Sequence, residues 1–520
     1  MSSSDEEMSI SAQAANDDDE DIDNKQPTTK IRVSFLLSPS VRNNRHQLEL
    51  PSEPMAVPSN IRKRGLSAIV NHLLDRGDRD DDDDSGSDDD DDDDERLPAI
   101  PFDFLLNDKL LRLPLDSAAR NMGLSTEHAL ELHYFPARLP PKKEGESEQL
   151  PDWIMVMDYN RCENRLFTGG ADGIIRTFEQ QQGAVNGGEL MGGCSISAHT
   201  GPIKCMSTLT SSQGSNTYIA TGSMDQTLVT HAYDAKKDEL NLHAVYSGGH
   251  SNSISSVVLA GGGENDGKQI MASGDWDGGL AIWNVPGTND GGGNVGGDSM
   301  KSSKKRKDNN SNSTSSSSSS NQGATIQEVQ SIHSVRAHSS NISGLAWGYS
   351  NNINSGSSSS SSSSLPSTLI TGSWDHGLKV YDISRMDCIL TLNGSRVVTS
   401  LSRCSNSDVV ATGSPDCTVR LWDMRTNGDG GSSGSQIADK TLRQSHKSWV
   451  SAIRWSPTDP FVLATTSHDG TLKVWDIRSS LPLHTVKATT NKGDKSLCLA
   501  FGDGMIYSGG SDCVVKKFAL

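Results

Sequence analysis

The N-terminal part of the chain shows hydrophobic patterns of both strands and helices. Apolar residues alternate in KIRVSFLL (30–37) and HQLEL (46–50), which predicts two strands, and recur at helical spacing in GLSAIVNHLLD (65–75). PFDFLLNDKLLRL (101–113) predicts a strand, an Asn-Asp turn and a strand, and a short helix separates it from a last strand, ALELHYF (129–135). This order of elements predicts a ubiquitin-like β-grasp (α+β) domain.

From residue 153 onward a repeat replaces this pattern. Each copy contains a strand that ends in small residues, a turn with an aspartate, an alternating strand and an aromatic residue. Seven copies occur, and their turn aspartates are Asp172, Asp225, Asp277, Asp375, Asp416, Asp469 and Asp512. This is the WD-repeat pattern, and seven copies predict a mainly β fold, a seven-bladed β-propeller. Because the seventh copy ends at Leu520, its outer strand is expected from the N-terminal side, near residues 140–158.

A histidine precedes the aspartate in four of the repeats. In WD repeats such a histidine bonds the turn aspartate, a strand hydroxyl and the strand tryptophan, so a structural role is favoured. The residues expected to form these networks are His199 with Asp225, His250 with Asp277, His338 with Asp375, and His446 with Asp469 and Trp475. A catalytic dyad is disfavoured, because no nucleophile with an oxyanion site accompanies the pairs. Repeats one, five and seven lack the histidine, so we expect their edges to be looser or used for contacts.

Composition indicates that much of the chain lies outside these two parts. Only 33% of the 520 residues are hydrophobic, against about 45–50% in typical globular proteins. We expect a disordered acidic tail at 1–28 and a ubiquitin-like domain at 29–140 that carries a disordered Asp-rich insertion at 76–96. The propeller is expected at 141–520, with a disordered Gly- and Ser-rich insertion at 286–328.

The net charge of −19 comes from two acidic blocks. Residues 1–24 contribute −9 and residues 75–95 contribute −13, so the remaining chain carries about +3. The Asp runs lack the alternating spacing of a calcium loop and favour a non-specific electrostatic role. The eight cysteines show no zinc or disulfide spacing, and no signal or membrane segment is recognisable, so a soluble intracellular protein without a cofactor of its own is expected.

Two motifs suggest binding functions. The basic cluster of Lys304, Lys305, Arg306 and Lys307 lies in a Ser- and Asn-rich stretch and predicts a nuclear localisation signal, with RNA contact as an alternative. GGENDGK (262–268) matches the first seven positions of a phosphate-binding loop, but Gln269 replaces the Ser or Thr that would ligate Mg²⁺. A hairpin is therefore favoured over a nucleotide site.

One acidic residue near the end of the ubiquitin-like domain is a candidate metal ligand. GLSTEHALELHYF (123–135) places Glu127 at an exposed connection just before the last strand. A free carboxylate there can complete the coordination shell of a hard cation that another protein holds. On these residues alone an ordinary surface glutamate is favoured.

Three longer segments resemble a known family. VPSNIRKRGLSAIVNHLL (57–74), PFDFLLNDKLLRLPL (101–115) and GLSTEHALELHYFPARLPP (123–141), followed by a seven-bladed propeller, are similar to the WD-repeat ribosome-biogenesis subunit of the PeBoW complex. The resemblance spans nearly the whole folded chain. It implies a Notchless-like ubiquitin-like domain, the partners pescadillo and the block-of-proliferation WD protein, and a role in large-subunit rRNA processing and pre-60S maturation in the nucleolus and nucleoplasm.

The same resemblance gives Glu127 a role. The matching glutamate of the GLS-x-E motif is understood to coordinate the Mg²⁺ of the MIDAS domain of midasin, an AAA ATPase that releases the complex from the pre-ribosome. Two features depart from the family pattern: the Asp-rich insertion is longer than expected, and Ser tracts at 313–320 and 357–364 enlarge loops.

The resulting hypothesis is a non-catalytic assembly factor. One alternative is a Notchless-type factor. Another is a substrate receptor of a cullin ubiquitin ligase, which would use the WDxR motifs WDMR (422–425) and WDIR (475–478). A hydrolase or NTPase is a third class, and it would require turnover by the purified chain.

Overall fold

The computed structural model divides the chain into two compact units, Met1–Arg138 and Leu139–Leu520. It describes residues 29–41, 45–51, 53–76, 97–179, 190–210, 217–261, 268–286, 327–348, 365–424, 440–442 and 444–520. The expected acidic tail and nearly all of the Asp-rich insertion lie outside these described residues.

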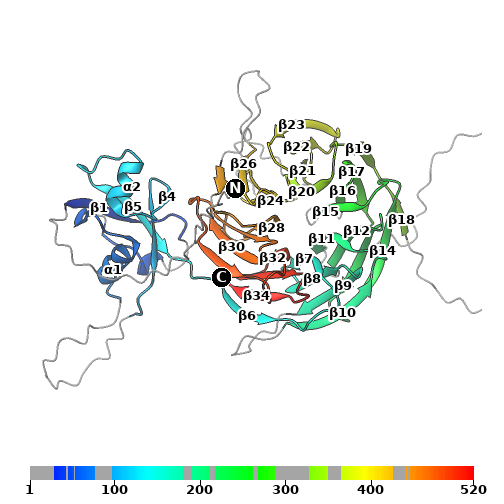
Figure 1. Ribbon diagram of the computed structural model, residues 1–520, viewed down its shortest axis with the longest axis horizontal. Helices are drawn as coiled ribbons and strands as arrows, with labels where there is room; N and C mark the ends of the chain where they lie inside the picture. The colour runs from blue at the N-terminus through cyan, green and yellow to red at the C-terminus, as the bar shows by residue number, and fades with distance from the viewer. Residues whose placement is uncertain are drawn as a thin grey trace, which may run out of the picture. The chain divides into compact units, whose positions relative to one another are not determined.

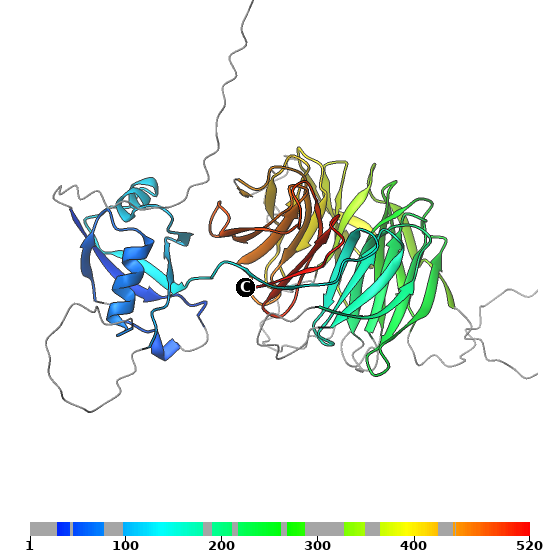
Figure 2. The same cartoon turned by 60° about the horizontal axis from the view of Figure 1, so that its bottom comes forward.

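The first unit is a β-grasp domain, as the sequence predicts. Its sheet has the strand order β2-β1-β5-β3-β4, in which β1 and β5 are parallel and the other pairs antiparallel. The strands are β1 (Lys30–Leu37), β2 (Met55–Pro58), β3 (Phe102–Leu106), β4 (Lys109–Leu110) and β5 (Leu130–Pro136). The helical elements are the 3-10 turn η1 (Arg45–Gln47), α1 (Lys63–Leu73) and α2 (Leu115–Asn121). Figure 2 shows α1 against one face of this sheet.

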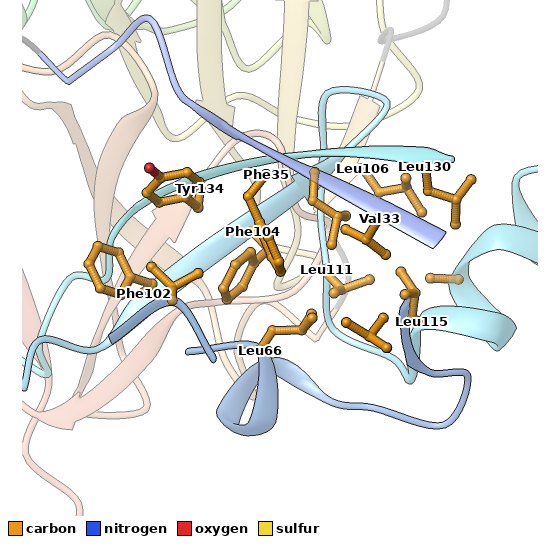
Figure 3. Close-up of a cluster of buried hydrophobic side chains, with 14 of the residues drawn as sticks. Val33, Phe35, Leu66, Phe102, Phe104, Leu106, Leu111, Leu115, Leu130 and Tyr134 are labelled. Atoms are coloured by element: carbon orange, nitrogen blue, oxygen red, sulfur yellow. The ribbon is translucent and has the colours of Figure 1, made fainter. Parts of the chain in front are cut away.

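Aliphatic and aromatic side chains together fill the core between the sheet and α1 (Figure 3). The apolar residues of α1 recur at helical spacing and face the sheet, so that Leu66 is fully buried. The ring of Phe104 packs 6.1 Å from that of Phe35, and the ring of Phe102 lies 5.8 Å from that of Tyr134 in an edge-on arrangement. This core fixes the ends of β5 and hence the loop that precedes it.

The second predicted strand is wrong. Residues 46–50 contain part of η1 and irregular backbone. β1 pairs instead with β2, a strand that the hydrophobic pattern does not predict. Leu48 is buried in the core, and its carbonyl accepts a hydrogen bond from the hydroxyl of Tyr134. The alternation of Leu48 and Leu50 thus reflects packing of irregular backbone against the core, with Tyr134 supplying the polar contact that a neighbouring strand would supply in a sheet.

The second unit confirms the seven-bladed propeller. Seven sheets surround a central axis, and Figure 1 shows the first strand of each blade, from β7 to β32, nearest the centre. Blade one comprises β7 (Ile154–Asn160), β8 (Arg165–Gly170), β9 (Ile174–Glu179) and β10 (Met191–Ser197). Blade two comprises β11 (Ile203–Thr210), β12 (Thr217–Ser223), β13 (Leu228–Asp234) and β14 (Glu239–Ser247). Blade three comprises β15 (Ile254–Gly261), β16 (Gln269–Asp275), β17 (Gly279–Val285) and β19 (His333–Arg336). Blade four comprises β20 (Ile342–Gly348), β21 (Thr368–Ser373), β22 (Gly377–Asp382) and β23 (Asp387–Asn393). Blade five comprises β24 (Ser400–Arg403), β25 (Val409–Gly413), β26 (Val419–Asp423) and β27 (Lys440–Leu442). Blade six comprises β28 (Val450–Trp455), β29 (Val462–Ser467), β30 (Thr471–Asp476) and β31 (His484–Lys487).

The end of the insertion between repeats three and four forms an additional strand. β18 (Gln327–Gln330) pairs in parallel with β14 and becomes the fifth strand of blade two. Ser247 of β14 hydrogen-bonds both Glu328 and Gln330 of β18, at 2.7 and 2.8 Å. The predicted end of the disordered insertion at residue 328 is therefore corrected to before Gln327, because Gln327 and Glu328 belong to a sheet.

A strand from the start of the second unit closes the propeller. Blade seven comprises β32 (Ser496–Phe501), β33 (Met505–Gly510), β34 (Lys516–Ala519) and β6 (Lys142–Glu146), in that order. Beyond β6, the backbone N–H of Ser147 donates to the carbonyl of Val515 at 2.9 Å, and the hydroxyl of Ser147 accepts from the N–H of Val515 at 3.0 Å. The two ends of the propeller sequence are thus joined in a single sheet, and β6 becomes the outer strand of the last blade.

Candidate functional site

Glu127 lies in the loop between α2 and β5. Helix α2 ends at Asn121, and Gly123 just beyond it has a φ of 68°, the left-handed conformation that glycine accommodates best. The backbone N–H groups of Gly123 and Leu124 donate to the carbonyls of Arg120 and Ala119, at 3.0 and 2.9 Å. Leu124 packs against the core, so the loop leaves the helix in a fixed direction.

The side chain of Glu127 is exposed at the tip of this loop. Its backbone N–H donates to the hydroxyl of Ser125 at 3.3 Å, while its carboxylate makes no hydrogen bond or ion pair with the described residues. Both carboxylate oxygens are therefore available to a cation. The described part of the chain contains no group of three or more His, Cys, Asp or Glu side chains that could hold a metal by itself. A metal at Glu127 would have to be supplied by a partner.

The histidines of three blades contact the turn aspartates that the sequence assigns to them. In blade six, Nδ1 of His446 lies 3.3 Å from Asp469, and its Nε2 lies 2.8 Å from the hydroxyl of Thr465, which also accepts the indole N–H of Trp475 at 2.9 Å. The corresponding distances from histidine Nδ1 to carboxylate oxygen are 3.4 Å for His199 with Asp225 and 2.9 Å for His338 with Asp375. These networks hold two strands and the turn of each blade together, which is a structural task.

Blade three uses a different aspartate. Nδ1 of His250 lies 2.9 Å from Asp275, and not on the expected Asp277, which is exposed. Asp275 also accepts the backbone N–H groups of Asp277 and Gly279, at 3.0 and 2.7 Å. The carboxylate thus comes from two positions earlier in the turn, a position that Ser373 occupies in blade four. The assignment of Asp277 is corrected to Asp275.

The three blades without the histidine pair their aspartates with a cation instead. The cation follows the aspartate by four residues, and the ion pairs are Asp172 with Arg176 at 2.5 Å, Asp416 with Arg420 at 2.6 Å, and Asp512 with Lys516 at 2.6 Å. The turn aspartates of these blades are thus held as well, and the expectation that the blade edges are looser or used for contacts stays a prediction. The sequence signal that could have identified these pairs is a basic residue four positions after the turn aspartate in a repeat that lacks the histidine.

The other motifs of the sequence are placed only in part. Lys304, Lys305, Arg306 and Lys307 lie outside the described residues, as do Arg425 of the first WDxR motif and residues 262–267 of the phosphate-loop match. The segment after that match begins β16 and not a helix, so it lacks the N-terminal amides that bind phosphate. No helix among the described residues is long and apolar enough to cross a membrane.

Arg478 of the second WDxR motif is already engaged within the propeller. Its guanidinium bonds both carboxylate oxygens of Asp476, at 2.9 and 2.6 Å, and lies 4.5 Å from the ring centre of Phe461. Its side chain is only 10% exposed. Its charge is thus satisfied inside the chain, which disfavours its use as a contact for a ligase adaptor.

We predict that the two aspartates of the blade-three turn differ in their effect on stability. Asp275→Ala leaves His250 and two backbone N–H groups without their acceptor, so the free energy of unfolding should fall by at least about 2 kcal/mol. Asp277→Ala is the matched control and should change it by less than about 0.5 kcal/mol. Urea unfolding of the propeller measures both, and equal effects would contradict the assignment.

The buried histidines predict a loss of stability in mild acid. Burial lowers the pKa of His199, His338 and His446, and their aspartate partners offset this only in part. Below the unfolded pKa of about 6.5, the unfolded chain therefore binds protons that the folded chain does not, and stability falls. Burial alone would raise the pKa of Asp225, but hydrogen bonds from Thr227 and Thr200 lower it to about 2, so this carboxylate affects stability only at pH values below about 4.

The measurement is the urea midpoint of the propeller at pH 7.5 and at pH 5.0. The midpoint should be lower at pH 5.0, and His446→Gln should reduce the difference between the two values. A midpoint that stays constant or rises on acidification would show that these imidazoles are not buried in the neutral form.

Comparison with known proteins agrees with the two parts of the fold. Residues 41–119 match the NLE (NUC135) domain, and the WD domain, G-beta repeat, matches at 193–229, 329–382, 386–423 and 439–476. A relative from Chlamydomonas reinhardtii, named Ribosome biogenesis protein WDR12 homolog, is 29% identical over 91% of this chain and 94% of its own length. The protein of the same name from Dictyostelium discoideum is 26% identical over 94% of each chain.

A fungal relative extends the comparison. Ribosome biogenesis protein YTM1 of Kluyveromyces lactis is 26% identical over 93% of this chain and 96% of its own length. These names all describe ribosome biogenesis. The chain is thus an NLE-domain protein with WD40 repeats, related over most of its length to the ribosome biogenesis proteins WDR12 and YTM1.

Proposed function

We propose that the protein is a non-catalytic assembly factor of the large ribosomal subunit that acts in the nucleus, in both the nucleolus and the nucleoplasm. The observation that carries this proposal is its similarity, over more than nine tenths of the chain, to relatives named for ribosome biogenesis. The finer proposal is that it is a PeBoW subunit, with pescadillo and the block-of-proliferation WD protein as partners on the pre-60S particle. The basic cluster of Lys304, Lys305, Arg306 and Lys307 is proposed as its nuclear localisation signal.

The NLE domain is proposed to bind the MIDAS domain of midasin through Glu127. Three observations support this role: the side chain is exposed, its carboxylate has no partner among the described residues, and the preceding turn at Gly123 orients the loop. A carboxylate oxygen is the kind of ligand that Mg²⁺ prefers, and the metal would remain with the partner. The protein itself then needs no resident cofactor.

Co-purification tests the assembly role. From a nuclear extract, the full chain should retain pescadillo, the block-of-proliferation WD protein and precursors of large-subunit rRNA. Recovery of a cullin adaptor without these components would instead support the ligase-receptor alternative. Because Arg478 is paired with Asp476, Arg478→Ala should leave recovery of the proposed partners unchanged if the chain folds.

Metal-dependent binding tests the role of Glu127. The full chain should bind an isolated MIDAS domain in the presence of Mg²⁺, and EDTA should abolish this binding. Glu127→Ala should weaken binding by at least about tenfold, or about 1.4 kcal/mol, since a metal ligand is lost. Glu127→Asp keeps the charge but shortens the reach, so it should bind with intermediate affinity.

Glu131→Ala is the matched control, because Glu131 is also exposed but lies in β5, four residues beyond Glu127. Its affinity should equal that of the wild type. If Glu127→Ala binds normally and EDTA has no effect, the contact is an ordinary protein surface. If the wild type does not bind at all, the midasin proposal fails while the co-purification result stands independently.

A further inference from the structure

The channel of the propeller contains a cavity of about 390 Å³. Residues of all seven inner strands line it, from Met155 in β7 to Leu499 in β32. In Figure 1 these strands surround the propeller axis. The cavity therefore belongs to the channel and lies apart from the hydrogen-bond networks of the individual blades.

A ring of large side chains surrounds one mouth of this channel. In blades two, three, four and six, one turn residue donates its backbone N–H to the carbonyl of the residue just before the inner strand of the same blade, at 2.9–3.1 Å. These donors are Met224, Trp276, Trp374 and His468, and their acceptors are Pro202, Ser253, Asn341 and Trp449. Because the turn geometry repeats, these residues occupy equivalent places on one face of the propeller.

The side chains of this ring are more exposed than apolar residues usually are. Met224, Trp276 and Trp449 are 46%, 42% and 47% exposed, and all three line the cavity. The rings of Trp276 and Trp374 lie 5.2 Å apart, and Trp449 stacks on His468 at 5.9 Å. Clustered exposed tryptophans mark surfaces that a partner covers.

Two buried polar atoms at the mouth have no hydrogen-bond partner in the described part of the chain. Oδ1 of Asn341, a residue that is only 4% exposed, and the indole N–H of Trp374 are both unpaired, and both residues line the cavity. A buried polar atom without a partner destabilises the free protein, so a ligand that bonds it gains affinity. One acceptor and one donor side by side in the fold are the complement of a peptide group, which offers one N–H and one C=O.

Two cations inside the channel form no ion pair with any acid among the described residues. Lys204 and Arg454 both line the cavity, and neither forms an ion pair with the described residues. Arg454 donates one hydrogen bond to the carbonyl of Ile453, and burial lowers the pKa of Lys204. Arg454 acts electrostatically on the buried Asp158, but that carboxylate is already bonded by the backbone N–H and the hydroxyl of Thr208, at 2.8 and 2.9 Å.

We propose that this mouth is a docking site for an acidic peptide segment of a partner protein. Its carboxylates pair with Lys204 and Arg454, its backbone bonds Asn341 and Trp374, and its apolar side chains pack on the tryptophan ring. A peptide fits better than single-stranded RNA, because the cations lie inside the channel and not along an exposed track that a phosphate backbone could follow. The site is separate from the contact proposed for Glu127, so either can fail without the other.

Fluorescence anisotropy with the full chain tests this proposal. The probe is a fluorescein-labelled decapeptide of alternating Glu and Leu, and the matched probe alternates Lys and Leu. The acidic peptide should bind, and Lys204→Gln combined with Arg454→Gln should weaken its binding by about tenfold or more. Trp276→Ala should also weaken it, whereas Lys204→Arg should retain it.

Two controls separate the site from the rest of the surface. Met191 in the outer strand β10 is 52% exposed and Lys447 is exposed, but neither lines the cavity, so Met191→Ala and Lys447→Gln should bind like the wild type. Thermal unfolding checks that each variant is folded. The proposal is overturned if the acidic peptide does not bind at millimolar concentration, if the basic peptide binds equally well, or if oligouridylate binds instead and depends on the same residues.

Discussion

A carboxylate in the turn after the second strand of each blade has to be paired inside the protein, and the propeller depends on this pairing. Four blades use a histidine from the preceding segment, while three use an arginine or lysine four residues later. The same carboxylates accept backbone N–H groups within their turns, for example those of Thr227 and Thr471. The pairing therefore fixes the turn conformation, and through it the ring of side chains at the channel mouth.

The sequence predicts those parts of the fold that local periodicity determines. The seven repeats, the helix α1 and the turn at Asn107 and Asp108, both with positive φ, are all encoded within short windows. The errors in strand pairing concern contacts between distant segments, whereas the error at Asp277 is a local shift of two residues to Asp275. Whether β1 pairs with residues 46–50 or with β2, and where β18 attaches, depends on tertiary packing that no periodicity records.

The two candidate sites differ in how well they can be predicted from the sequence. Glu127 lies in a short motif just before a strand, and the structure adds the Gly123 turn and the unpaired carboxylate. The channel mouth combines residues from all parts of the propeller, so no single window contains it. Its only signal within a short stretch of sequence is the tryptophan just before the turn aspartate in two successive repeats, Trp276 and Trp374. That these two side chains lie together is seen only in the folded propeller.

The closing strand gives the chain a particular mechanical arrangement. β6 begins at Lys142, a few residues after the NLE domain ends at Arg138, and Lys142 pairs with Ala519 beside the C-terminus. Tension applied along the chain from the NLE domain therefore reaches the propeller first at this short ladder, which the ion pair of Lys517 with Glu144 reinforces at 3.2 Å. The strength of the pairing between β34 and β6 therefore determines the force at which pulling on the first unit would begin to open the propeller.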